Sequence, residues 1–155
     1  MAKTLIHITG RLPKDFELGR AELKKAAQAF AAKSARRSGS VFREVTIVLQ
    51  DDILSDSAHR AVMDVEGATD VITQGFDAMP GEPEGVYGEL YVNAERAAKA
   101  APKKSTWSKE KELLLYIAHG MDHLSGEDDS SPKDYARMRS RELRWIKEYE
   151  TEKNH

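Results

Sequence analysis

Apolar residues recur along the chain at two spacings, which predict a succession of strands and helices. Alternation and β-branched residues predict strands over residues 3–8, 41–49, 70–73 and 86–92. Apolar positions three or four residues apart predict helices over residues 20–33, 56–63, 94–100 and 108–123, and a last helix that begins at Pro132. The run of apolar residues within 108–123 indicates that this helix is buried.

Turn-forming residues separate these segments. Gly, Pro and Glu are frequent in residues 75–85, which predicts a surface loop, and residues 102–105 are expected to form a linker. Ser108 is placed to cap one helix, and Pro132 occupies the favoured first turn of another. Since 155 residues are enough for one buried core and too few for two, we expect a single domain over residues 1–155.

Composition excludes several classes of protein and of metal site. The chain has no cysteine, so it has no disulfide framework, and a metal ion would have to be held by imidazole and carboxylate groups. The first residues lack the pattern of a signal peptide, and no apolar stretch reaches the roughly 20 residues that span a bilayer. We therefore expect a cytoplasmic protein without a membrane partner.

Charge is distributed unevenly, although the formal net charge is only −2. Ten basic and four acidic side chains lie in residues 1–45, and the rest of the chain carries an acidic excess. A basic front third can steer a polyanion toward one face of the molecule. The same charges are equally consistent with the solvated surface of a helix, and both interpretations stay open.

Candidate chemistry is concentrated in residues 119–129, which read HGMDHLSGEDD. His119 and His123 are four residues apart, so on a helix their β-carbons lie about 5 to 6 Å apart and both rings can bind the same ion. Gly126 can end the helix in a left-handed conformation, which would bring Asp129 within reach as a third ligand. Three protein ligands leave the fourth position of a zinc tetrahedron open for water, as in catalytic sites.

Each of these residues also has an ordinary structural interpretation. A histidine pair on a helix face is often only a polar surface, and residues 127–129 can form a solvated acidic turn before the helix at Pro132. The other histidines, His7, His59 and His155, are distant in sequence or terminal, and they are weak ligand candidates.

Several segments match patterns of one known family. Residues 119–128 meet the pattern H-G-x-x-H-L-x-G-x-D, and residues 69–73, TDVIT, are similar to a strand pattern of the same family. Residues 88–90, GEL, are similar to another strand, and Met138 with Glu142 match the last helix. From about residue 45 to residue 146, the chain thus resembles the YbeY-type rRNA maturation endoribonucleases.

This resemblance implies an α+β fold in which a small mixed β-sheet of about four strands is packed by about five helices, with the metal-binding helix in the core. It also implies one zinc ion (Zn2+) per chain, held by His119, His123 and, in this sequence, Asp129. The implied function is metal-dependent endonucleolytic cleavage of single-stranded RNA in rRNA processing and ribosome maturation. The expected partner is therefore single-stranded RNA, in particular rRNA of a ribosomal subunit, and no DNA partner is expected.

Three positions depart from the family pattern. Asp129 stands where a histidine is usual; a carboxylate binds zinc at about 2.0 to 2.2 Å, although the metal preference can widen toward harder cations. Met63 stands where an arginine is usual, and Arg60, on the same helix face, is a candidate replacement for a phosphate contact. Gln74 stands where a phenylalanine is usual, in the wall of the groove.

Zinc in such a site would lower the pKa of a bound water toward about 7 and polarise a phosphoryl oxygen. Asp122, Asp128 and Glu89 are the acidic candidates for a general base, and we favour Asp128, although a carboxylate that only orients a histidine ring would leave the same trace. The predicted catalytic residues are therefore Asp128 and Arg60.

Two other functions fit the same residues. One is a zinc metallopeptidase, but in H-E-x-x-H peptidases a glutamate that acts as general base follows the first histidine, and Gly120 takes its place here. The other is a ribosome-biogenesis factor that retains the metal site without cutting RNA. The departures from the family pattern at Asp129 and Met63 are consistent with this alternative.

Overall fold

The structure is a computed structural model that describes residues 3–101 and 106–154. These residues contain four strands and five helices, in the order β1 (Leu5–Gly10), α1 (Arg20–Ser38), β2 (Phe42–Gln50), α2 (Asp52–Met63), β3 (Val71–Phe76), β4 (Val86–Asn93), α3 (Ala94–Ala100), α4 (Lys109–Leu124) and α5 (Pro132–Lys153). The predicted number and order of elements are therefore confirmed within the described ranges.

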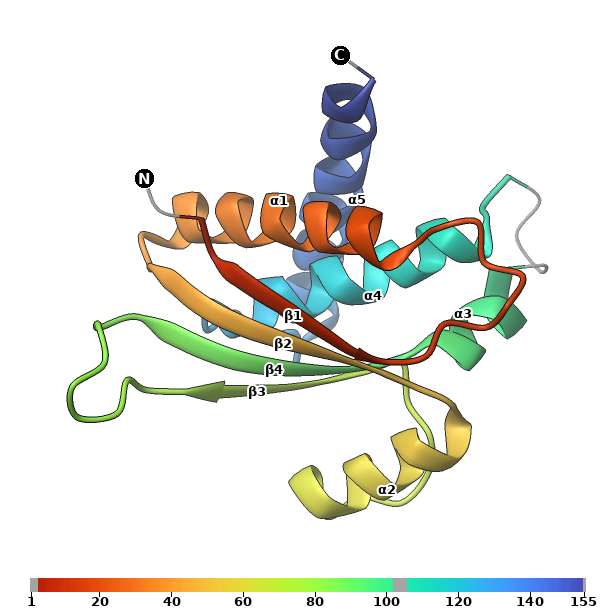
Figure 1. Cartoon of the computed structure of the whole chain (residues 1–155), viewed down its shortest axis with the longest axis horizontal. Coiled ribbons are helices and arrows are strands. Elements are labelled where there is room, and N and C mark those ends of the chain that lie inside the picture. The colour runs from red at the N-terminus through yellow and green to blue at the C-terminus, as the bar shows by residue number, and fades with distance from the viewer. Residues whose placement is uncertain (1–2, 102–105, 155) are drawn as a thin grey trace.

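A mixed sheet with the strand order β1-β2-β4-β3 forms the centre of the fold (Figure 1). Strands β1, β2 and β4 run parallel, and β3 pairs with β4 in the antiparallel direction. Helices α1 and α4 cover one face, and α2 lies against the opposite face near one end of the sheet (Figure 1). This arrangement confirms the expected α+β fold with a mixed sheet.

Helix α4 lies in the core, as the resemblance implied, with 12 of its 16 residues buried. Its backbone approaches β4 closely at Gly120. A β-carbon at that position would lie 2.8 Å from Cδ2 of Leu90, a side chain that is fully buried. Gly120 is therefore required by packing. Because α4 lies this close to β4, the neighbouring His119 is held in the interior of the protein.

Two helices are longer than predicted because their caps lie outside the predicted ranges. Helix α1 continues to Ser38, not to residue 33, and ends where Gly39 adopts a φ of 74° and donates its N–H to the carbonyl oxygen of Ala35 at 2.8 Å. Helix α2 begins at Asp52 rather than at residue 56, because the carboxylate of Asp51 accepts the N–H of Leu54 at 2.9 Å.

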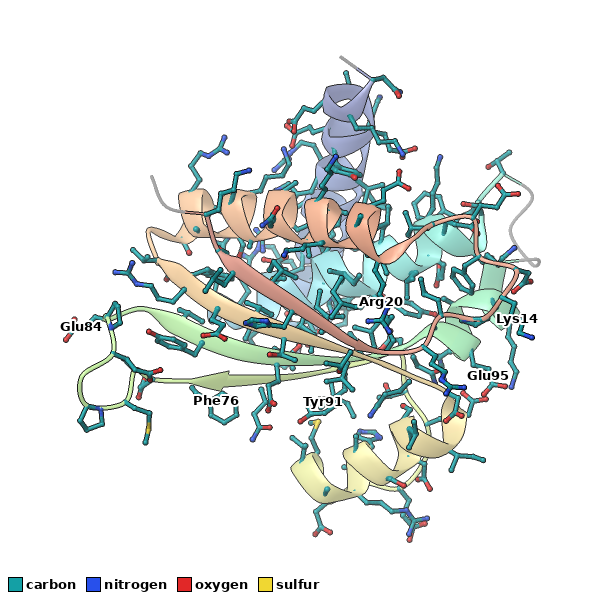
Figure 2. All side chains as sticks on the ribbon, in the orientation of Figure 1. Lys14, Arg20, Phe76, Glu84, Tyr91 and Glu95 are labelled. Carbon is teal, nitrogen blue, oxygen red and sulfur yellow. The ribbon has the colours of Figure 1, made fainter. Side chains whose placement is uncertain are left out.

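Two strands also differ from the prediction. Strand β1 occupies residues 5–10 instead of 3–8, and β3 extends to Phe76, which pairs with Tyr87, so the predicted loop over residues 75–85 begins two residues too early. Figure 2 shows Phe76 and Tyr91 on the sheet face that points away from α1 and α4. The linker predicted at residues 102–105 lies outside the described residues.

Across the described ranges, none of the helices combines the length and the apolar character that crossing a bilayer requires.

Candidate metal centre

Three donor atoms converge where α4 ends. The Nε2 atoms of His119 and His123 are 3.1 Å apart, and Oδ2 of Asp129 lies 3.3 Å from the first and 3.2 Å from the second. His119 is buried, whereas His123 and Asp129 are half-buried. The structure therefore brings together the three residues that the sequence suggested as ligands.

The turn that carries Asp129 back to the helix forms as expected at Gly126. This residue has a φ of 94°, in the left-handed region, and its N–H donates to the carbonyl oxygen of His123 at 2.9 Å. No neighbouring atom lies within 4 Å of where a β-carbon would stand, so glycine is favoured here by backbone conformation and not by space.

The second ring nitrogen of each histidine is held by a partner of its own. Nδ1 of His119 lies 2.8 Å from Oε2 of Glu142, and Nδ1 of His123 lies 3.0 Å from the backbone carbonyl oxygen of Glu127. Since a carbonyl oxygen only accepts, Nδ1 of His123 carries a proton, and in the neutral ring Nε2 then presents a lone pair. The carboxylate of Glu142 favours the same tautomer for His119, as partners of metal-bound histidines commonly do.

Burial and charge act in opposite directions on the buried pair. Burial lowers the pKa of His119, but the hydrogen bond and the negative charge of Glu142 outweigh it, so this pKa is raised above its ordinary value. Burial also disfavours the charged form of Glu142, which for a carboxyl group raises the pKa, whereas the hydrogen bond with His119 lowers it. A cation at Nε2 of His119 would take the place of a proton there.

The donor set fits a bound cation. With bonds of 2.0 to 2.1 Å, a tetrahedral zinc site has edges of about 3.3 Å between its ligand atoms, and the three observed distances lie between 3.1 and 3.3 Å. Two nitrogen lone pairs and a carboxylate oxygen at this separation repel one another unless a positive charge lies between them. His119, His123 and Asp129 could therefore hold one ion.

We predict that Glu142→Ala weakens metal binding by about 10- to 100-fold, because the loss of a partner that orients a ligand has that effect in metal sites. Competition with a chromogenic zinc chelator would measure the affinity. Glu148→Ala is the matched control on the same helix, because Glu148 is exposed and pairs with Lys33 at 3.5 Å. Equal affinities of the two variants would contradict an orienting role for Glu142.

A cavity of about 410 Å³ opens beside the donor atoms. Its lining has no lysine or arginine and consists of Met63, Thr73, Gly75, His123, Leu124, Gly126 and Asp129. Within the described part of the chain, the buried hydroxyl of Thr73 has no hydrogen-bond partner. The cavity thus combines the donor atoms with an unpaired polar group and an apolar wall.

Neither of the two predicted catalytic residues belongs to the donor cluster or to the lining of the cavity beside it. Arg60, on α2, is exposed and forms an ion pair with Asp56 at 3.1 Å. The carboxylate of Asp128 accepts the N–H and the hydroxyl of Ser130 at 2.9 and 2.8 Å, and these hydrogen bonds hold its pKa below the usual range. A lowered pKa makes Asp128 a weaker base, and both roles stay predictions.

The other two acidic candidates for a general base are held elsewhere. Asp122 is fully buried and is bound by the guanidinium of Arg141 at 2.9 Å. Glu89 lies between Gly88 and Leu90, whose positions face α4, so its side chain points to the opposite face of the sheet. Sequence reasoning missed Arg141, although its helical spacing from the apolar positions Met138 and Trp145 places it on the buried face of α5.

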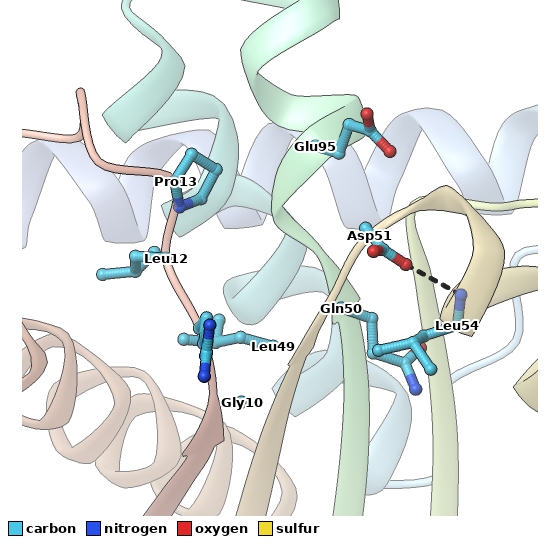
Figure 3. A pocket seen from close by; sticks show the side chains of 9 residues that line it. Gly10, Leu12, Pro13, Leu49, Gln50, Asp51, Leu54 and Glu95 are labelled. Carbon is cyan, nitrogen blue, oxygen red and sulfur yellow. Dashed lines mark hydrogen bonds between the residues drawn. The ribbon is translucent and has the colours of Figure 1, made fainter.

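A second cavity, of about 450 Å³, lies at the carboxyl ends of β1 and β2 and is lined by none of the predicted site residues (Figure 3). Two of its polar groups serve the start of α2. Asp51 accepts the N–H of Leu54, drawn as a dashed line, and Glu95 accepts the N–H of Asp52 at 2.9 Å. Helix capping therefore accounts for the two carboxylates of this lining, but not for Arg11 or for Gln50, whose buried Oε1 has no hydrogen-bond partner among the described residues.

Fold and site together define an α+β protein with a His-His-Asp donor cluster at the end of a buried helix. The sequence profile of the family described as Endoribonuclease YbeY matches residues 13–150, which is most of the chain. The chain belongs to the YbeY family.

Individual relatives agree with this assignment. The chain is 36% identical over 132 residues to an Endoribonuclease YbeY of Rhodopirellula baltica, 32% over 101 residues to one of an Arthrobacter species, and 29% over 113 residues to one of Salinibacter ruber. These matches cover 84%, 61% and 70% of this chain, and 64%, 64% and 71% of the relatives. The chain thus spans less than two thirds of the length of the first two.

A solved structure shares the fold. The solution structure of TM1509 from Thermotoga maritima superposes with a TM-score of 0.58, at 20% identity, over 96% of this chain and 93% of that one. At this identity, the likeness concerns the fold alone.

Proposed function

We propose that this chain is a metal-dependent endoribonuclease that cleaves single-stranded RNA, in particular rRNA during ribosome maturation. The observation that carries the proposal is the convergence of three donor atoms in a chain of the YbeY family. Zinc is the ion we propose, because two imidazoles and one carboxylate are ligands that zinc accepts and cysteine is absent. One ion per chain and a cytoplasmic location without membrane or DNA partners complete the proposal.

The chain's own residues would hold and orient the reacting groups. His119, His123 and Asp129 would bind zinc, which supplies Lewis acidity for attack at phosphorus. The cavity beside them would receive the RNA. Asp128 is ionised at neutral pH and is available as an acceptor at the rim of the site.

The test combines metal content with cleavage of a labelled single-stranded RNA. Wild type should carry about one zinc ion and cut, whereas His119→Ala and Asp129→Ala should lose both metal and cleavage. His7→Ala is the matched control, because His7 is exposed on β1 and pairs with Glu44 at 2.6 Å. Metal loss in the variants without loss of cleavage would contradict a catalytic metal.

One observation favours a second candidate, a ribosome-associated factor that keeps the metal without cutting RNA. The cavity is lined by Met63 where the family pattern has arginine, and no lysine or arginine replaces it in the lining. Wild-type protein that holds zinc, binds ribosomal subunits and leaves RNA intact would support this candidate. A peptidase function lacks such support, because Gly120 is required by packing where H-E-x-x-H peptidases carry the catalytic glutamate.

Arg60 is proposed to contact phosphate, for which its side chain would have to exchange Asp56 for the RNA. We predict that Arg60→Ala lowers the rate of RNA cleavage and leaves zinc content unchanged, because Arg60 is absent from the donor cluster. Single-turnover cleavage with a fixed RNA measures the effect, and Arg144→Ala, at an exposed position on α5, is the control. An unchanged rate in Arg60→Ala would remove this residue from the site.

A further inference from the structure

A buried arginine lies directly behind the donor cluster. Arg141, on α5, donates from Nε and Nη2 to the carboxylate of Asp122 at 2.9 to 3.2 Å, and its Nη2 also lies 2.8 Å from Oε1 of Glu127. Arg141 is 9% exposed and Asp122 is fully buried. One guanidinium thus joins α4 to the loop that follows it.

Both partners of Arg141 are connected to the proposed ligands. Asp122 directly precedes His123 on α4. Glu127 lies two residues before Asp129, and its backbone carbonyl oxygen is the acceptor for Nδ1 of His123 at 3.0 Å. Displacement of Glu127 would therefore disturb the orientation of one ligand and the position of another.

The acidic loop needs a positive charge to hold this conformation. Residues 127–129 carry three consecutive carboxylates, and the third stands where the family pattern has a histidine. Besides Arg141, the guanidinium groups of Arg37 and Arg137 lie 3.8 Å from Oε1 of Glu127. Arg37 also reaches both segments, since its guanidinium donates to the hydroxyl of Ser125 and lies 3.8 Å from the carboxylate of Asp122. Arg141 is the more buried of the two, and its guanidinium lies within 3.0 Å of the carboxylates of both Asp122 and Glu127, a double contact that the rigid fork of arginine permits and a lysine ammonium would not.

We propose that Arg141 is a positioning residue that fixes the loop of residues 125–129 against α4, and so keeps Oδ2 of Asp129 within the donor cluster. The inference rests on the proposed metal site but not on RNA cleavage. Asp122 and Glu127 stand at positions that the pattern H-G-x-x-H-L-x-G-x-D leaves open. The contact is therefore a property of this sequence and not of the motif.

The experiment measures metal binding of the full chain without RNA. Zinc affinity is obtained by chelator competition, and the visible absorption of the Co²⁺-loaded protein reports the ligand set. Glu127→Ala breaks the contact of Arg141 to the loop, together with the longer ion pairs of Arg37 and Arg137, and leaves the buried pair of Arg141 and Asp122 in place; Arg141→Lys separates the role of Arg141 from theirs. We expect it to weaken zinc binding by about 10- to 100-fold and to change the Co²⁺ spectrum. Arg141→Lys should do the same, and Arg144→Lys, at an exposed position, should match wild type.

Thermal unfolding in EDTA identifies any variant that fails to fold. If folded Glu127→Ala binds zinc with wild-type affinity and gives the wild-type Co²⁺ spectrum, the positioning role is overturned, whatever Arg141→Lys does. If wild type itself binds neither ion, the metal centre of the proposed function fails as well. Loss of RNA cleavage with normal metal binding would overturn only the role of Arg141, because these variants are expected to fail first in metal binding.

Discussion

His123→Ala is expected to lower the zinc affinity of the chain by more than about 100-fold, because the loss of a partner that merely orients a ligand already costs about 10- to 100-fold. The substitution removes one of three donors, and it also breaks the hydrogen bond from Nδ1 to the carbonyl oxygen of Glu127. Zinc competition with a chromogenic chelator would measure the loss.

His7→Ala provides the matched control for this measurement. His7 is exposed on β1 and its ring bonds Glu44, so its loss removes a histidine without touching the donor cluster. Retention of wild-type zinc affinity by His123→Ala would show that the ion binds elsewhere. A fall in both variants would point to a general effect of histidine removal and not to the proposed centre.

Phe30→Ala is expected to cost about 3 to 5 kcal/mol of the free energy of unfolding, as is typical of a buried phenylalanine cut back to alanine. Phe30 is fully buried on α1, and its ring lies 5.8 Å from the ring of Tyr149 on α5. The substitution would leave a cavity between two helices that pack around α4. Urea denaturation followed by circular dichroism would measure the loss.

Phe76→Ala is the comparison for that substitution. Phe76 is 45% exposed at the end of β3, so removal of its ring leaves no closed cavity. A change within about 0.5 kcal/mol is expected, as for most surface substitutions. Similar losses in the two variants would contradict the assignment of Phe30 to the core.

The histidine pair could be predicted from sequence because it depends only on local geometry. Once residues 108–123 form a helix, a spacing of four residues brings the two rings together, and the observed Nε2 atoms are 3.1 Å apart. The return of Asp129 depended on one backbone conformation, which glycine signals in a sequence, and Gly126 adopts it. Both inferences needed no knowledge of how distant segments pack.

The residues that sequence reasoning missed act across the tertiary structure. Arg141 lies on α5, which begins after the acidic loop, and it binds Asp122 and Glu127 on earlier segments of the chain. A single arginine among apolar positions of a helix does not indicate in the sequence which residues it will contact. Arg60 is a different case, because Asp56, which holds its guanidinium, lies four residues earlier on the same helix, at a spacing that indicates an ion pair from sequence. The start of α2 was missed for a local reason, since Asp51 caps the helix through the N–H of Leu54 before the predicted range begins at residue 56.

The donor cluster is built from parts of unequal rigidity. His119 and His123 lie on a helix that is packed into the core, whereas Asp129 lies on a loop that turns at Gly126 and is partly exposed. An ion bound there would therefore be released by displacement of the loop, which requires that the contact of Arg141 with Glu127 break, while the two histidines keep their places. The residence time of the metal would then report the opening rate of a few loop residues, and exchange with free ions could be fast even where binding at equilibrium is tight.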